Sequence, residues 1–229
     1  MFIVLVRHGE IGNNKEPNKP LNYNERNYLS KTGIKQAKKT ARFLKQLNIK
    51  RIYSSPYGRA YQTALYFSKE SKKAIEILDW LREFQMGDPE LTEEDWIKEI
   101  RENSNRYLEE TYSNPPGWES TYSFADRIRT GMQELLKTHK IYRRFGGFIS
   151  RNMAEYGIVL FAHGGTIKEI IKFFLDIPPT PHPAFIVQNG AAAIIEFEEI
   201  KGILYPYLRI DPPYYPDYPG WSMKFGIFR

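Results

Sequence analysis

The chain contains no cysteine, which excludes disulfide bonds, thiolate catalysis and zinc or iron–sulfur centres held by cysteine. Only four of the 229 residues are histidine, so a histidine-rich metal site is not expected. No apolar stretch approaches the roughly 20 residues that a membrane-spanning helix requires. The first residues also lack the basic leader and the small-residue cleavage site of a signal peptide. We therefore expect a cytoplasmic protein with no membrane partner.

The chain is basic, with a formal net charge of +6, which would suit an anionic substrate. General surface solubility explains this charge better than nucleic-acid binding does, because lysines such as Lys35, Lys38 and Lys39 fall on the solvated side of an expected helix. The aromatic residues are also not interleaved with arginines, as a platform for single-stranded nucleic acid requires. No nucleic-acid partner is expected.

One short pattern occurs twice in the chain. Residues 3–9 read IVLVRHG, and residues 158–164 read IVLFAHG. Each copy has the continuous apolar run of a buried strand and ends in histidine and glycine. Because ligands bind at the carboxyl edge of open α/β sheets, His8 and His163 are expected to meet across one crevice. Only the first copy carries Arg7, and the glycine after His8 is expected to let the strand break there.

Strands and helices alternate over most of the chain. Strands are predicted near 3–6, 49–53, 74–78, 158–162 and 191–197, and helical spacing predicts helices after Ser30, over 59–67, over 124–137 and after His163. This alternation predicts an α/β fold, with a mainly parallel central sheet flanked by helices in one domain over residues 1–229. Residues 84–123 break the pattern with acidic, aromatic sequence, which predicts a helical lid insertion. Residues 205–229 form a tail rich in tyrosine and proline.

Two arginines and two histidines fall at expected carboxyl ends of strands. Guanidinium groups match phosphate oxygens with paired hydrogen bonds and stay charged, so Arg7 and Arg59 are candidates to hold a phosphoryl group. Arg59 follows the block Ser54-Ser55-Pro56, at the end of another strand. His8 would attack phosphorus with a neutral ring nitrogen, because nearby arginines lower its pKa. His163 would donate a hydrogen bond to a phosphoryl oxygen.

A leaving alkoxide also needs a proton. Glu83, just after the third expected strand, is the candidate donor, and Asn14 in the first loop is a candidate neutral ligand of the phosphate. Taken singly, such residues are more often structural, because a histidine after a strand is commonly just hydrogen-bonded. Taken together, they favour phosphoryl transfer. His139, at a polar helix end, and His182, between prolines, are interpreted as structural.

A series of short motifs extends this pattern between about Ile3 and Phe197. They are LVRHGE with Asn14, LSKTGIKQA, SSPYGRAYQTA, Leu81-x-Glu83-x-x-x-Gly87, PGWES at 116–120, and VLFAHGGTIKEII. In this order they closely resemble the histidine phosphatase superfamily, in its phosphoglycerate-mutase-like branch. The resemblance implies a three-layer α/β sandwich, a phosphohistidine intermediate, and no metal or other cofactor.

The resemblance also implies a role for each matching residue. His8 would be the nucleophile and Glu83 the proton donor. The phosphate pocket would consist of Arg7, Asn14, Arg59, His163 and the backbone amide of Gly164. In the mutases of this family, an arginine and soon a tyrosine follow the acidic glutamate and bind the substrate carboxylate.

The chain departs from that mutase pattern. Phe84, Gln85 and Met86 follow the glutamate, and none of them is a cation. Asp88-Pro89-Glu90 replaces a tryptophan-glutamate-glycine block, which changes the expected contacts between lid and substrate. Gly164, rather than an aspartate, follows the second histidine, which strengthens the case for the glutamate as the acid.

The sequence therefore predicts a metal-independent phosphatase that hydrolyses monoesters of small phosphorylated metabolites through a phosphohistidine on His8. A phosphoglycerate mutase or another phosphotransferase with the same chemistry is the alternative. A non-catalytic module that binds a phosphorylated ligand is less favoured, because a binder needs no proton donor. Homo-oligomerisation is left open.

Overall fold

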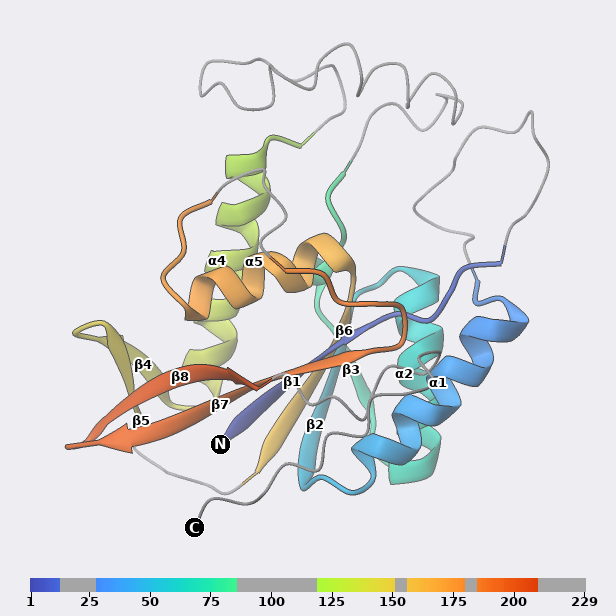
Figure 1. Ribbon diagram of the computed structural model, residues 1–229, viewed down its shortest axis with the longest axis horizontal. Helices are drawn as coiled ribbons and strands as arrows, with labels where there is room; N and C mark the ends of the chain where they lie inside the picture. The colour runs from blue at the N-terminus through green and yellow to red at the C-terminus, as the bar shows by residue number, and fades with distance from the viewer. Residues whose placement is uncertain (13–27, 86–118, 151–155, 180–184, 210–229) are drawn as a thin grey trace.

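A computed structural model describes residues 1–12, 28–85, 119–150, 156–179 and 185–209. Its strands are β1 (Phe2–Arg7), β2 (Ile49–Ser54), β3 (Ile75–Ile77), β4 (Ile141–Arg144), β5 (Gly147–Ser150), β6 (Gly157–Ala162), β7 (Ala192–Ile200) and β8 (Ile203–Arg209). Its helices are α1 (Lys31–Leu44), α2 (Gly58–Ser71), the short 3₁₀ helix η1 (Asp79–Leu81), α4 (Thr121–Thr138) and α5 (Gly164–Phe174). The strands form one eight-stranded sheet in the order β3-β2-β6-β1-β7-β8-β5-β4 (Figure 1).

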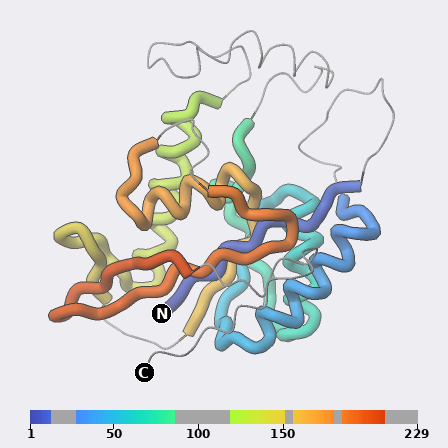
Figure 2. The backbone as a smooth tube through the Cα atoms, viewed as in Figure 1, coloured from blue at the N-terminus to red at the C-terminus, as the bar shows by residue number. Residues whose placement is uncertain are grey.

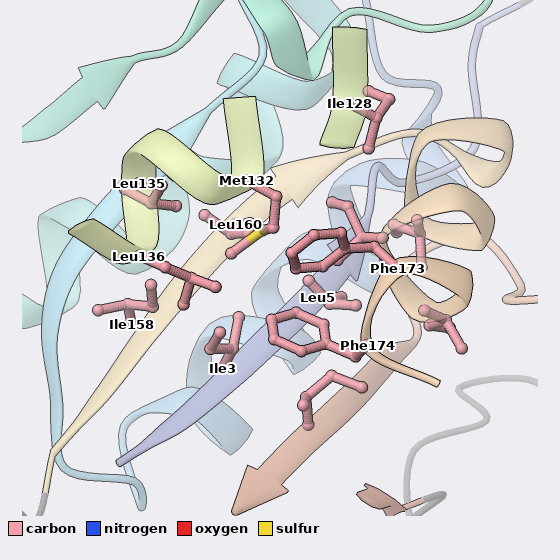
Figure 3. Packing of buried hydrophobic residues seen from close by; sticks show 14 of the residues in the cluster. Ile3, Leu5, Ile128, Met132, Leu135, Leu136, Ile158, Leu160, Phe173 and Phe174 are labelled. Atoms are coloured by element: carbon pink, nitrogen blue, oxygen red, sulfur yellow. The ribbon is translucent and has the colours of Figure 1, made fainter. Parts of the chain in front are cut away.

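Helices cover both faces of the sheet, which makes the fold a three-layer α/β sandwich. Figure 2 shows α1 and α2 together on one face and α4 and α5 on the other. The side chains of β1 alternate accordingly: Ile3 and Leu5 belong to the cluster under α4 and α5, and Val4 and Val6 to the cluster under α1 and α2. Figure 3 shows the first of these clusters, with side chains from both helices lying over β1 and β6. None of the described helices is both long and apolar enough to cross a membrane.

The sheet is mixed, which corrects the prediction of a mainly parallel sheet. Strands β3, β2, β6 and β1 pair in parallel, whereas every pair from β1 to β7 onward is antiparallel. The antiparallel half depends on two tight hairpins, at Phe145-Gly146 between β4 and β5 and at Lys201-Gly202 between β7 and β8. Both residues of each turn have positive φ, which matches the right-handed twist of paired strands. The sequence reasoning identified neither turn.

The predicted insertion and tail lie mostly outside the described residues, and each overlaps a described element at one end. The predicted insertion, 84–123, overlaps the first turn of α4, where the Ser120 side chain caps the helix by accepting from the amide of Ser123. Residues 86–118 lie outside the described part of the chain. The predicted tail, 205–229, overlaps β8, which continues to Arg209, because the tyrosines of this stretch alternate along a strand. Residues 210–229 again lie outside the described residues.

Candidate active site

The two histidines lie at the same edge of the sheet. Arg7 ends β1 and is paired with Ala162, which ends β6, so His8 and His163 leave the sheet side by side. The centroids of the two imidazole rings are 5.2 Å apart. Arg59 reaches the same place from the first turn of α2, which follows β2. The parallel half of the sheet thus brings these residues together from distant parts of the sequence.

His8 is held as a neutral imidazole. Its Nδ1 lies 2.8 Å from the carbonyl oxygen of Gly9, and because a carbonyl can only accept, Nδ1 must carry the proton and donate. The other ring nitrogen, Nε2, therefore has its lone pair available. Burial lowers the pKa of His8 to about 3, helped by the charges of Arg59 and Arg7 and opposed by the hydrogen bond to Gly9. The side chain is thus in the form that a nucleophile requires.

His163 is neutral too, but both of its ring nitrogens are engaged. The Nε atom of Arg59 donates to Nδ1 at 3.2 Å, so Nε2 carries the proton and donates to the Oγ atom of Ser55 at 2.9 Å. Burial, followed by the charge of Arg59, lowers the pKa of His163 well below its ordinary value. The predicted donation to a phosphoryl oxygen would require Nε2–H to leave Ser55. Sequence reasoning noted Ser55 only as part of a motif and missed this contact.

The two arginines differ in their surroundings. Arg59 is 3% exposed and lies over the ring of Tyr57, with Cζ 5.1 Å from the ring centroid. Arg7 donates through Nη1 to the carbonyl oxygen of Val187 at 2.9 Å, and its guanidinium packs against Gly164. Burial lowers the pKa of Arg7, an effect that the charge of Glu83 opposes. The Nε atom of Arg7 is buried and has no hydrogen-bond partner among the described residues, which leaves a donor for a ligand.

Glu83 lies at the N-terminus of α5. Its Oε2 accepts from the amide of Gly165 at 3.1 Å, and its Oε1 accepts from the amides of Thr166 at 3.2 Å and Phe84 at 2.9 Å. The carboxylate therefore satisfies donors that the first turn of a helix leaves open. A Cβ atom at Gly165 would lie 2.5 Å from Oε1, so the Glu83 carboxylate would have to move to make room for it. We predicted the amide of Gly164 as a site group and missed the amides of Gly165 and Thr166.

The strand ends directly before His8, as predicted, but Gly9 is needed for space rather than for backbone freedom. Its φ is not in the left-handed region, and an added Cβ would instead lie 2.5 Å from the carbonyl oxygen of Gly33 in α1. The glycine is needed because the loop after His8 passes directly over the start of this helix. The amide of Gly9 also donates to the Oγ1 atom of Thr63 in α2 at 3.1 Å. Helices α1 and α2 together fix the main chain beside the nucleophile.

Residues of α4 contact the segment 80–85, which carries Glu83 and is called the acid segment below. The ring of Phe84 packs into the core against Phe124, edge to face with centroids 5.3 Å apart. A cation does reach this segment from α4, because Arg127 donates to its carbonyl oxygens, and sequence reasoning missed this arginine.

His139 lies between the hydroxyl groups of Tyr53 and Tyr156, at 3.0 Å from each, in agreement with a structural role. Asn14 and His182 lie outside the described residues.

Among the residues that the structure describes, no three histidine, aspartate or glutamate side chains form a group that could hold a metal ion. The site is built instead from two neutral imidazoles, two guanidinium groups and one carboxylate. Such a set offers a nucleophile, fixed positive charge for an anionic group, and a group able to carry a proton.

Known proteins resemble this chain in sequence and in fold. The model for the histidine phosphatase superfamily (branch 1) matches residues 3–205. Phosphoglycerate mutase-like protein 4 of Arabidopsis thaliana is 29% identical over 175 residues, covering 74% of this chain and 69% of the relative. Phosphoserine phosphatase 1 of Hydrogenobacter thermophilus is 25% identical over 178 residues, covering 77% and 78%. The fold is also similar to mycobacterial glucosyl-3-phosphoglycerate phosphatase in complex with VO3, with a TM-score of 0.70 at 24% identity, covering 91% of this chain and 97% of that one.

Proposed function

The chain belongs to branch 1 of the histidine phosphatase superfamily, and we propose that it hydrolyses phosphate monoesters through a phosphohistidine formed on His8. One observation carries the proposal. His8 has its Nε2 lone pair available in a buried site, because Nδ1 donates to Gly9, and two arginines lie close enough to lower its pKa. A binding module has no use for a nucleophile prepared in this way.

In the first step, Nε2 of His8 attacks phosphorus and the bond from phosphorus to the ester oxygen breaks. The equatorial oxygens carry the spread charge of the transition state, and the guanidinium groups of Arg7 and Arg59 stabilise it. The departing alkoxide takes a proton from the carboxyl group of Glu83. The positive charge that forms on the imidazole is shared through Nδ1–H with the carbonyl group of Gly9.

In the second step, water attacks the phosphohistidine. The bond from phosphorus to Nε2 breaks, which returns His8 to its neutral form, and the Glu83 carboxylate takes a proton from the attacking water. Inorganic phosphate leaves, and Glu83 has regained the proton that it gave up in the first step. The cycle needs no metal ion, and we propose that a chelator leaves turnover unchanged.

Water is the proposed acceptor because neither Phe84 nor Gln85, the two residues that follow Glu83, is a cation that could bind a substrate carboxylate. Phe84 follows the acid and turns into the core against Phe124, and Arg127 is already paired with Glu119. A carboxylate desolvated there without a partner would cost several kcal/mol. With 3-phosphoglycerate as substrate, we expect more free phosphate than isomer. Efficient interconversion of 2- and 3-phosphoglycerate with little free phosphate would favour the mutase alternative instead.

The role of Glu83 can be tested through the leaving group. Glu83→Gln should lower kcat/KM for an alkyl phosphate by about 10²-fold or more, because an alkoxide cannot leave without a proton. An aryl phosphate such as p-nitrophenyl phosphate leaves as a stable anion and should lose less than about tenfold. Equal losses for both substrates would remove the acid role from Glu83. We also propose that the natural substrate is a small phosphorylated metabolite of the cytoplasm, which a screen of purified protein against such compounds would identify.

A further inference from the structure

The guanidinium of Arg127, on α4, is directed at the main chain of the segment that carries Glu83. Its Nη1 donates to the carbonyl oxygens of Trp80 at 2.6 Å and Arg82 at 3.2 Å, and its Nη2 lies 3.4 Å from that of Glu83. Three carbonyl groups in four consecutive residues thus face one cation. Only the planar fork of an arginine has enough donors in fixed directions to serve them together.

The remaining edge of the guanidinium is held by a carboxylate. Nε of Arg127 donates to Oε1 of Glu119 at 2.8 Å, and Nη2 donates to Oε2 at 2.7 Å. The two side chains are 19% and 13% exposed, so solvent weakens this paired contact little. The amide of Glu119 also donates to the carbonyl oxygen of Gln85 at 2.9 Å. Glu119 therefore orients the arginine and ties it to the end of the acid segment.

Helix α5 holds the same segment from the other side. The Oγ1 atom of Thr166 donates to the carbonyl oxygen of Arg82 at 2.9 Å, and the amides of Gly165 and Thr166 donate to the Glu83 carboxylate. The main chain is thus fixed from α4 and the carboxyl group from α5. If the main chain moved, the carboxyl group could not keep its place.

We propose that Arg127 is a positioning residue for the proton donor Glu83, oriented by Glu119. The inference rests on the proposed acid role of Glu83. A general acid must lie within about 2.6–3.2 Å of the oxygen that it protonates. A displacement of about 1 Å can lower the rate by about 10²-fold. Arg127 acts on that distance without touching the substrate, so its effect should follow the leaving group.

The test combines Arg127→Met with Glu119→Gln, so that no partly buried charge is left unpaired. For the double variant, kcat/KM for an alkyl phosphate should fall by about 10²-fold, and that for p-nitrophenyl phosphate by less than about tenfold. Arg129→Met is the matched control. Arg129 lies on the same helix and donates to the carbonyl oxygen of Ile177 at 2.7 Å, so its loss should leave the ratio of the two substrates unchanged.

Two further variants separate the outcomes. Arg127→Lys keeps the charge and the fold but not the fork, and should show the same selective loss on the alkyl phosphate. In a Glu83→Gln background, the Arg127 and Glu119 changes should add no further loss on that substrate. Equal losses on both substrates, or a full additional loss in the Glu83→Gln background, would overturn the positioning role. If Glu83→Gln itself shows no selectivity, the acid role fails first, and with it the proposed mechanism.

Discussion

The two strand ends that carry His8 and His163 are nearly the same in sequence but different in structure. After β1 the chain enters a loop that crosses the start of α1, and the carbonyl group of Gly9 takes the Nδ1 proton of His8. After β6 the chain turns at once into α5, and His163 is its N-cap. One imidazole keeps an available nitrogen, and the other has protein partners at both.

The difference shows that the repeated motif decides where an imidazole lies, whereas its neighbours decide what it can do. A backbone carbonyl selects the tautomer of His8. Arg59 and Ser55 select the opposite tautomer of His163. Only the first arrangement is suited to attack on phosphorus, and the second is suited to orient and donate.

The largest expected effect separates the two histidines directly. His8→Ala should lower kcat by about 10⁴-fold or more, since it removes the nucleophile. His163→Ala should cost less, about 10²- to 10³-fold, because it removes one donor. Steady-state kinetics with p-nitrophenyl phosphate measure both. A His8→Ala enzyme that keeps more activity than His163→Ala would reverse the assignment.

Arg59 contacts the second histidine, and after burial its charge is the largest cause that lowers the pKa of both histidines. Arg59→Met should lower kcat by about 10²-fold for alkyl and aryl phosphates alike, because charge on the transferred group develops with either leaving group. This uniform loss contrasts with the selective one expected for Glu83→Gln. A loss confined to alkyl phosphates would place Arg59 in the proton-transfer step instead.

The two glycines after His163 offer a matched pair. A Cβ at Gly165 would meet the Glu83 carboxylate at 2.5 Å, whereas one at Gly164 would meet the Arg7 guanidinium at an ordinary 3.5 Å. Gly165→Ala should therefore displace the acid and lower alkyl phosphate turnover by about tenfold. Gly164→Ala should change it little. If Gly164→Ala is the more damaging variant, contact with the Arg7 guanidinium matters more than the position of the acid.

The neutral state of His8 should appear in the pH dependence of stability. Folding lowers the pKa of His8 from 6.5 to about 3. Between these two pH values His8 is protonated in the unfolded chain but neutral in the folded chain. Stability is therefore lost as the pH falls from 6.5 toward 3, at up to about 1.4 kcal/mol per pH unit from this group. His8→Gln should remove that contribution. Urea unfolding of both proteins at pH 7.5 and 4.5 measures it, and parallel pH dependences would contradict it.

The parallel half of the fold could be predicted from sequence because β1 and β6 are continuous apolar runs and the helices carry apolar residues at helical spacing. Among the described strands of the antiparallel half, β7 lies where a strand was predicted, but β4, β5 and β8 do not. Strands β4 and β5 are four residues each, and their turn places Phe145 at positive φ, a conformation that a phenylalanine rarely adopts. No propensity rule finds such a turn, because tertiary pairing imposes it.

The site divides in the same way. Arg7, His8, Arg59, Glu83 and His163 could be chosen because each follows or lies near an expected strand end. Gly165, Thr166 and Arg127 could not be assigned their contacts, because these depend on how α4 and α5 pack beside η1. The contact of Ser55 with His163 depends on the pairing of β2 with β6. The PGWES block contains Glu119, but its partner Arg127 lies eight residues later in the chain. The sequence alone does not show that this pair packs beside the segment that carries Glu83.

The most direct test of the mechanism is to identify the phosphorylated atom. Rapid quenching during turnover, followed by peptide mapping and ³¹P NMR at alkaline pH, should find phosphate on Nε2 of His8. The adduct should be acid-labile and base-stable, and absent from His8→Ala. Nδ1 should stay unmodified, because it donates to Gly9. Phosphate on Nδ1 or on His163, or no phosphoenzyme during rapid turnover, would contradict the proposed mechanism.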